Sequence, residues 1–252
     1  MTAAMPRGGP DASRLDRWYE TDRPEYLDRP DTPREAARVR RGLDRLHRLT
    51  GGYDRFARWT LAHAGGAPAP RVLELGAGGG GLSRRVLERH PAARVTVSDV
   101  DAGTVAALRA GPLGAHPRAT VRWLDATAVD APDRAFDVAV FAASLHHLPA
   151  DQVRAVLREG TRVAGTLLLI DAWRSPLLCV PAVPLMFLTG GRAHVHDGLI
   201  SLRKAYGPAA LRVLAATAGP EPLRLRVRFG LPGCLVAAVS APGRVPGRSG
   251  SR

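Results

Sequence analysis

The sequence has little cysteine, little aromatic surface and no long uninterrupted apolar run. Its two cysteines, Cys179 and Cys234, lie far apart in apolar surroundings. That spacing excludes a disulfide framework or a cysteine-based metal site and predicts two buried, unreactive thiols. Aromatic residues make up only 5% of the chain, so stacking platforms for nucleic-acid bases are scarce.

The most apolar stretch, residues 177–188, is well short of the ~20 residues that span a bilayer. Pro181 and Pro184 also interrupt it. The first ten residues lack the apolar core of a secretory signal peptide. We therefore expect no transmembrane segment and a cytoplasmic protein.

Lysine is almost absent, although the net charge is +13. Every basic residue except Lys204 is arginine, and alanine, glycine and proline are abundant, which indicates a GC-rich coding bias as much as a basic surface. The arginines are scattered rather than clustered. Nucleic acid is therefore not the expected partner, although an RNA-binding protein stays open as an alternative from a different class.

The chain of 252 residues is long enough for one α/β domain with an extension. Residues 1–33 show no periodicity and are predicted to be disordered at the N-terminus. Apolar residues at three- and four-residue steps predict a helical cap over residues 34–66. The main domain is expected over residues 67–240, followed by a basic, disordered tail at 241–252.

From residue 71 onward, strand and helix patterns alternate, which predicts an α/β fold with a doubly wound, mostly parallel, seven-stranded sheet. Strands are expected at 71–75, 94–98, 120–124, 136–141, 165–171, 223–229 and 233–240, and helices near 82–90, 102–110, 150–162 and 207–217. The proline-bearing stretch after Asp171 is predicted to be irregular. Ligands of such sheets bind at the carboxyl ends of the strands.

The first of these strand ends carries a glycine-rich turn. The sequence Val-Leu-Glu-Leu-Gly-Ala-Gly-Gly-Gly-Gly at 72–81 predicts a buried strand, a turn and the start of a helix. Such a turn lets the backbone approach a nucleotide-like cofactor. The glycines fit the dinucleotide pattern G-x-G-x-x-G and also the pattern acid-x-G-x-G-x-G that starts at Glu74. A carboxylate disfavours a pyrophosphate but suits an ammonium and a sulfonium, so Glu74 favours S-adenosylmethionine.

Two further acids follow the next two strands. Asp99 ends the second strand, where a carboxylate can accept both ribose hydroxyls of an adenosine. Asp101, its nearby rival, is better explained as the cap of the following helix. Asp125 ends the third strand and is either a partner of the adenine amino group or a helix cap.

The fourth strand and its continuation carry the most diagnostic pattern. The sequence from 136 to 149 ends in Leu-His-His-Leu-Pro, and here the chain resembles the small-molecule branch of the class I S-adenosylmethionine-dependent methyltransferases. Together with the glycine turn, the resemblance covers residues 71 to about 171. It implies that the cofactor is held by these residues: Glu74, Leu75, Gly76, Ala77, Gly78, Gly80, Asp99, Val100, Asp125, Ala126 and Ala142.

The C-terminal part is similar to one branch of this superfamily, actinobacterial methyltransferases associated with type III polyketide synthases. The shared pieces are Asp-x-x-Arg-Ser-Pro at 171–176 and the pattern from His196 to Tyr206. Residues 46–52 also fit, although that branch usually has Asn where His47 stands. This resemblance implies a small aromatic or polyketide-like acceptor.

Methylation of a hydroxyl requires a base beside the methyl group, and imidazole titrates in the right range. In similar O-methyltransferases, a His after the fourth strand works with an Asp after the fifth, which His146 and Asp171 match. Adjacent residues on a helix point about 100° apart, so His146 and His147 cannot both do this job. We expect His146 to be the base and His147 to be a buried structural residue.

Other interpretations stay open. C-methylation of a phenol or quinone precursor needs the same deprotonation, and an NAD-dependent oxidoreductase could use the same glycines. His194-x-His196-Asp197 suggests a metal site, but no acid cluster accompanies it, so we expect a polar pocket wall and no metal. Residues 177–188 are either an apolar cover over the acceptor or ordinary core.

Overall fold

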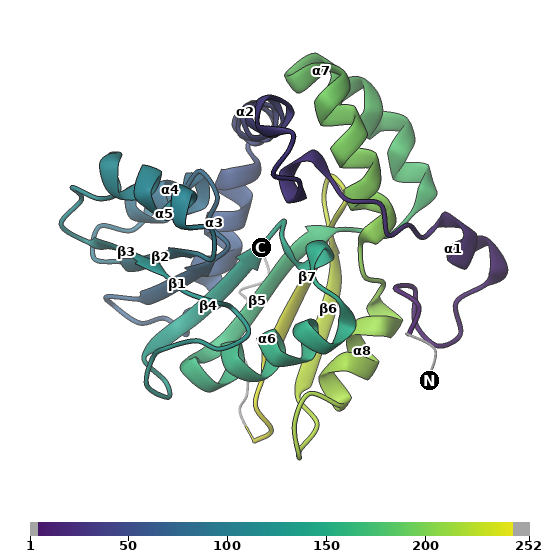
Figure 1. Ribbon diagram of the computed structural model, residues 1–252. Coiled ribbons are helices and arrows are strands. Elements are labelled where there is room, and N and C mark those ends of the chain that lie inside the picture. The colour runs from purple at the N-terminus through teal and green to yellow at the C-terminus, as the bar shows by residue number, and fades with distance from the viewer. Residues whose placement is uncertain (1–4, 244–252) are drawn as a thin grey trace.

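The computed structural model describes residues 5–243 and contains a seven-stranded sheet with the order β3-β2-β1-β4-β5-β7-β6 (Figure 1). The first five strands are parallel, and β7 runs antiparallel to both β5 and β6. This sheet confirms the predicted fold class. The strands are β1 (Arg71–Leu75), β2 (Arg94–Asp99), β3 (Ala119–Trp123), β4 (Phe136–Ala142), β5 (Ala164–Ala172), β6 (Arg224–Gly230) and β7 (Cys234–Ser240).

Helices cover both faces of the sheet, and the alternation of side chains along each strand separates two cores. In β1, Val72 packs with α3 (Gly52–Ala62), α4 (Gly81–Arg89) and α5 (Ala102–Ala110). Leu73 packs on the opposite face with α6 (Ala150–Val163) and α8 (Pro208–Ala216). The two-residue period therefore also sends Glu74 toward α4.

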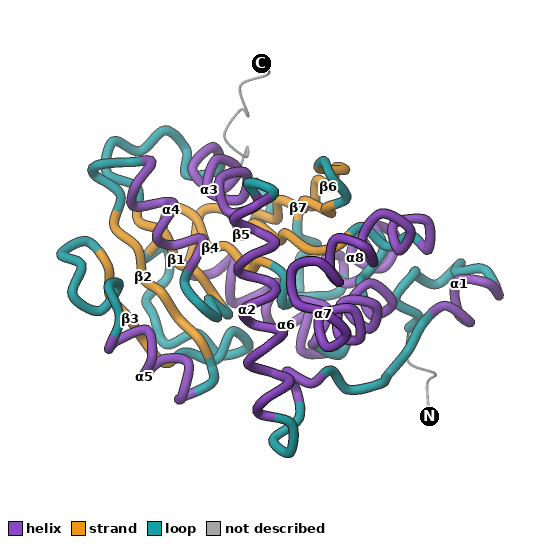
Figure 2. Tube along the Cα trace, turned by 90° about the horizontal axis from the view of Figure 1, so that it is seen from above, coloured by secondary structure: helices purple, strands orange, loops and turns teal. Residues whose placement is uncertain are grey.

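Two helices, α2 (Pro33–Leu49) and α7 (Cys179–Lys204), lie over the carboxyl ends of the central strands (Figure 2). They approach so closely that a Cβ on Gly42 would lie 3.0 Å from the Cα of Gly190. The prediction of an irregular stretch after Asp171 is therefore wrong. Pro181 falls in the first turn of α7, where its missing N–H costs nothing, and the helix continues through Pro184.

By length and composition alone, the segment Pro176–Lys204 could cross a membrane, with a mean hydropathy of 1.3 in its most apolar window. Its backbone is broken at Gly191, however, where φ is 67° and ψ is −158°. A Cβ on Gly198 would meet the sulfur of Met186, so the two halves of α7 pack side by side as a hairpin (Figure 1). Each half is shorter than the ~20 residues that a membrane span needs, which makes this weak evidence for a span.

The N-terminal segment, residues 5–32, packs against the sheet domain, contrary to the predicted disorder. It contains α1 (Arg14–Tyr19) and the short 3-10 helix η1 (Tyr26–Asp28). The buried guanidinium of Arg174 bonds the carboxylate of Asp16, and the carboxylate of Asp197 accepts the backbone N–H groups of Tyr26 and Leu27. Most of the predicted tail at 241–252 lies outside the described residues.

Candidate functional site

The glycine turn between β1 and α4 has the shape that a close backbone approach requires. Gly76, Gly78 and Gly80 have φ values of 60°, 50° and 69°, in the left-handed region that glycine adopts at little cost. A Cβ added to Gly78 would meet no atom within 4 Å, whereas one on Gly76 would lie 2.8 Å from the ring of Phe141. The turn therefore borders open space on its outer side, and the N-terminal N–H groups of α4 follow directly. The residues present fit an adenosine-containing cofactor.

Glu74, the acid that distinguishes the two glycine patterns, is buried under this turn. Its carboxylate accepts hydrogen bonds from the backbone N–H and the hydroxyl of Ser83 in the first turn of α4. Burial raises its pKa to about 7, against the opposing effect of the Ser83 hydrogen bonds. The carboxylate thus fixes the helix to the strand, and its predicted contact with the cofactor stays a prediction.

Asp99 reaches the glycine turn from the end of β2. Its Oδ2 accepts the N–H of Gly78 at 2.9 Å, and its Oδ1 accepts the N–H of Asp101. Asp101 itself caps α5 by accepting the N–H of Thr104 at 2.7 Å, as predicted. The predicted ribose acid therefore lies beside the turn, while its rival has a purely local role.

The other predicted cofactor residues lie at the same edge of the sheet. Asp125 follows β3, and its Oδ1 accepts the N–H and hydroxyl of Thr127 in a tight turn; no helix begins there. Val100 is exposed, and its carbonyl accepts the indole N–H of Trp123. Leu75 and Ala77 are buried, while Ala126 and Ala142 are half-buried. Their roles toward the cofactor stay predictions.

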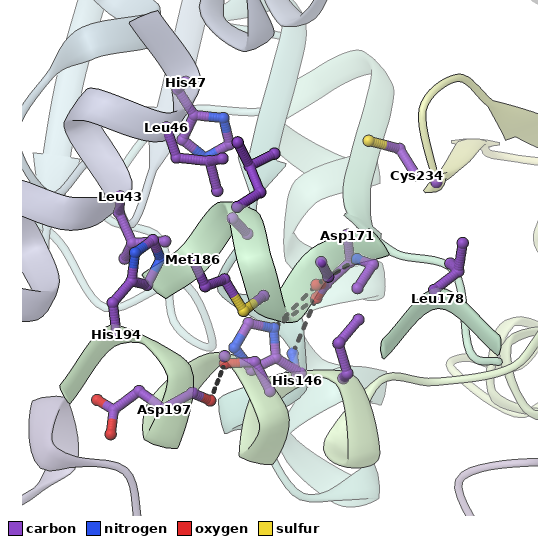
Figure 3. A pocket seen from close by; sticks show the side chains of 18 of the residues that line it. Leu43, Leu46, His47, His146, Asp171, Leu178, Met186, His194, Asp197 and Cys234 are labelled. Atoms are coloured by element: carbon purple, nitrogen blue, oxygen red, sulfur yellow. Dashed lines mark hydrogen bonds and ion pairs between the residues drawn. The ribbon is translucent and has the colours of Figure 1, made fainter. Parts of the chain in front are cut away.

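His146 and Asp171 form a buried pair at the ends of β4 and β5 (Figure 3). The ring Nδ1 lies 2.8 Å from Asp171 Oδ1, and the backbone N–H of His146 donates to Asp171 Oδ2 at 3.0 Å. Burial pushes the pKa of Asp171 upward, but the charge of His146 and these hydrogen bonds outweigh it and hold the pKa below its usual value. An ionised Asp171 can only accept, so it assigns the Nδ1 proton and leaves Nε2 as the free nitrogen.

His147 is not the fully buried residue that the helical spacing predicts. Both histidines lie in the 3-10 helix η2 (Leu145–His147), and their ring centroids are only 4.4 Å apart. His147 keeps 24% of its side chain exposed, and its Nδ1 lies 2.9 Å from Asp28 Oδ1. Asp28 belongs to the N-terminal segment, so no local pattern could place it there.

Glu25, from the same segment, faces both rings. It is 1% exposed, its Oε1 lies 3.7 Å from His146 Nε2, and its Oε2 lies 3.8 Å from His147 Nε2. Burial is the main cause that raises its pKa to about 7. Nothing in the sequence singled out Glu25 or Asp28; the one available signal was Lys204, the single lysine, whose Nζ lies 3.5 Å from Asp28 Oδ2.

These side chains border a cavity of about 290 Å³ with a mostly apolar lining (Figure 3). α2 contributes Leu43 and Leu46, and the first half of α7 contributes Leu185 and Met186. The polar groups His146, His147, Asp171 and Glu25 line the same space. The first half of α7 thus covers the cavity, while Phe187 and Leu188 point outward and are exposed.

His194, His196 and Asp197 do not converge on one point. His194 Nδ1 lies 3.0 Å from the hydroxyl of Thr189, whereas His196 stacks on Tyr26 and pairs with Asp197. His194 and Asp197 do line the cavity, as expected of a polar wall. Among the described residues, the group that could hold a metal is Glu25, His146 and His147.

Of the cysteines, Cys234 lines the cavity, and burial raises its pKa to about 11.

The geometry can be compared with known proteins. The sequence profile of the family described as "Methyltransferase domain" matches residues 72–165. No curated protein sequence matches the chain. Solved structures share the fold: a SAM-dependent methyltransferase from Aquifex aeolicus has a TM-score of 0.51 and 20% identity, over 73% of this chain and 88% of that one.

Two other similar structures are methyltransferases with a bound ligand. Human N-acetylserotonin methyltransferase in complex with SAM has a TM-score of 0.55 and 18% identity, over 87% of this chain and 63% of that one. CalO1, a methyltransferase in calicheamicin biosynthesis in its SAH-bound form, has a TM-score of 0.57 and 22% identity, over 90% and 67%. The matched domain and the glycine turn support an S-adenosylmethionine-dependent methyltransferase, and the similar structures show that the chain has the methyltransferase fold.

Proposed function

We propose that this methyltransferase methylates a hydroxyl oxygen of a small, mostly apolar acceptor, with His146 as the general base. The observation that carries the proposal is the His146–Asp171 pair, with Nδ1 and Oδ1 2.8 Å apart, at the wall of an apolar cavity. The pair also lies close to the cofactor turn. Ser144 precedes His146 by two residues, and its hydroxyl lies next to Gly76 of the turn: a Cβ added to Gly76 would be 3.2 Å from it.

The roles of the two residues follow from their protonation. Asp171 holds the Nδ1 proton, which fixes the tautomer and turns the Nε2 lone pair into the cavity. S-adenosylmethionine, when bound at the glycine turn, supplies an electrophilic methyl group. His146 takes the hydroxyl proton onto Nε2 as the acceptor oxygen attacks, and the carboxylate of Asp171 stabilises the imidazolium that forms.

The cavity supports an aromatic or polyketide-like acceptor. Its volume suits a small molecule, and leucine and methionine side chains from α2 and α7 form much of its wall. Two proteins of similar fold are human N-acetylserotonin methyltransferase and CalO1, a methyltransferase in calicheamicin biosynthesis. The resemblance of residues 171–176 and 196–206 to polyketide-associated methyltransferases narrows the proposal to a phenolic hydroxyl.

The test is turnover of a panel of phenols, with the methylated product identified by mass spectrometry. We expect His146→Gln and Asp171→Asn to lower kcat by about 10²–10⁴-fold, as for a lost general base, while calorimetric affinity for S-adenosylmethionine stays unchanged. His63→Gln is the matched control, because its ring contacts the carbonyl of Trp59 away from the cavity. Full activity of the His146 variant, or methylation at carbon only, would contradict the proposal.

A further inference from the structure

Each of the two adjacent histidines has a carboxylate beside its Nδ1 atom, although only the contact between His146 and Asp171 has hydrogen-bond geometry. His146 Nδ1 lies 2.8 Å from Asp171 Oδ1, and His147 Nδ1 lies 2.9 Å from Asp28 Oδ1. A carboxylate at Nδ1 orients an imidazole and makes its other nitrogen a better ligand, which is the usual arrangement of metal-binding histidines. Both Nε2 atoms are thereby left to face Glu25.

The distances from the two Nε2 atoms to Glu25 are too long for hydrogen bonds. They are 3.7 Å to Oε1 and 3.8 Å to Oε2, whereas N–H···O bonds have donor–acceptor distances of about 2.7–3.2 Å. Two ligands of a zinc ion, each bound at about 2.0–2.1 Å, can be at most about 4.2 Å apart. The separations therefore suit ligands on either side of a cation better than a shared proton.

For the third separation the known limit is looser than the ~4.2 Å that one ion allows, so the group must close slightly to bind an ion. The ligand atoms of Glu25, His146 and His147 all lie within 4.8 Å of one another. Closing this group around one ion requires the side chains to move by less than ~1 Å. All three residues also line the cavity, so a fourth position would open toward it.

The charges around the group favour a cation. Glu25, Asp28 and Asp171 bring three carboxylates together, and Glu25 and Asp171 are almost fully buried. Among the described residues, the Lys204 ammonium is the fixed cation that pairs with this set, through Asp28. Buried carboxylates need compensation, and a dication would provide it while both imidazoles stay neutral.

We propose that Glu25, His146 and His147 form a binding site for a divalent transition-metal cation such as Zn²⁺. Two imidazoles and one carboxylate with an open fourth position are a known ligand set for this class of ion. The prediction of no metal was argued for His194, His196 and Asp197; this site instead needs the N-terminal segment. A cation on His146 Nε2 and the use of that nitrogen as a base exclude each other, so the proposed base acts only in the metal-free protein; this consequence alone rests on the proposed function.

The test is binding to the full-length protein after treatment with a chelator, without any acceptor. Calorimetry with Zn²⁺ should give one ion per chain, and Co²⁺ should give the intense visible absorption of a four-coordinate site. Glu25→Gln and His147→Gln should each weaken binding by at least 10–100-fold, and Asp28→Asn, through His147, by about 10–100-fold. His63→Gln serves as the control and should leave binding unchanged.

Two results would overturn the proposal. One is the absence of stoichiometric binding by a folded protein that still binds S-adenosylmethionine. The other is binding that Glu25→Gln and His147→Gln leave intact, which would show that the ion binds adventitiously to histidines on the surface. Circular dichroism of each variant checks that it folds. Because no turnover is measured, failure here is separate from failure of the proposed base.

Discussion

The cofactor side of the site, at the ends of β1 to β3, and the acceptor side, at the ends of β4 and β5, are built in different ways. At the ends of β1 to β3 the acids bond residues at most 21 positions away: Asp125 bonds Thr127, two positions away, Glu74 bonds Ser83, nine away, and Asp99 bonds Gly78, 21 away. At the ends of β4 and β5 the separations are longer. Asp171 lies 25 positions from His146, and Ser201 donates to Glu25 across 176 positions. The cofactor side is thus a set of local turns, while the acceptor side is assembled from segments that meet only after folding.

The difference has a consequence for how each half responds to mutation. A local turn holds its shape through its own hydrogen bonds, so a change there should act on ligand affinity and little else. An assembled wall depends on the contacts that pin distant segments together, so changes far from the cavity should reach it. The next three predictions test this difference.

The largest effect is expected at Arg174, which pins the N-terminal segment. Its guanidinium, 3% exposed, bonds the carboxylate of Asp16 and the carbonyls of Arg203 and Ala205. Arg174→Leu leaves these acceptors without a partner and should lower the free energy of unfolding by about 3 kcal/mol, measured by urea denaturation. Limited proteolysis should cut the N-terminal segment faster, while affinity for S-adenosylmethionine stays unchanged.

Arg29→Leu is the matched control, because Arg29 pairs with Asp31 on the surface of the same segment. We expect no measurable change in proteolysis for this variant. Equal protection of the N-terminal segment in wild type and Arg174→Leu would show that the segment is held by other contacts, and the acceptor side would then be less interdependent than the hydrogen bonds indicate.

The same difference explains how much could be predicted from the sequence. The strand periodicity and the glycine turn placed all seven strands, and the helix expected at 102–110 is α5 at those bounds. These features depend on neighbours in the chain. The first 33 residues have no periodicity, yet Tyr19 and Glu25 are buried. Their burial comes from contacts with residues more than 150 positions away, such as Cys179 and Ser201, which local patterns do not encode.

The α7 hairpin was missed for a related reason. Pro181 and Pro184 argue against a helix when only local propensity is considered, but packing outweighs propensity here. Gly42 and Gly190 allow α2 and α7 to touch, and Gly198 accommodates Met186. The positions of His146 and Asp171 could be predicted because Asp171 lies at the end of one recognisable strand, His146 lies just past another, and the resemblance pairs them; Asp28 and Glu25 could not.

A smaller effect is expected from His47, which lines the acceptor cavity. Burial lowers the pKa of its ring to about 4, below the unfolded value of about 6.5. The folded state therefore binds fewer protons, so stability is full above about pH 6.5 and falls as the pH drops toward 4. Because part of the ring faces the cavity, we expect this loss to be about 2 kcal/mol.

His47→Asn should remove this pH dependence. The measurement is the urea midpoint of wild type and variant between pH 4 and pH 7.5. The difference between the urea midpoints of wild type and variant should be smaller at pH 4 than at neutral pH. Parallel curves over the whole range would show that the ring of His47 is solvated in the folded protein and that this wall of the cavity is open.

The smallest effect belongs to the cofactor side, where Asp99 and Asp101 form a natural pair for comparison. Asp99 faces the glycine turn, whereas Asp101 caps α5. Asp99→Asn should weaken S-adenosylmethionine binding by about 10-fold in calorimetry, because a charged acceptor for the ribose hydroxyls is lost, with little change in stability. Asp101→Asn should keep the affinity, since asparagine is also a good cap. If both variants bound equally well, the ribose would lie elsewhere, and the cofactor side would not be the self-contained set of turns that its hydrogen bonds describe.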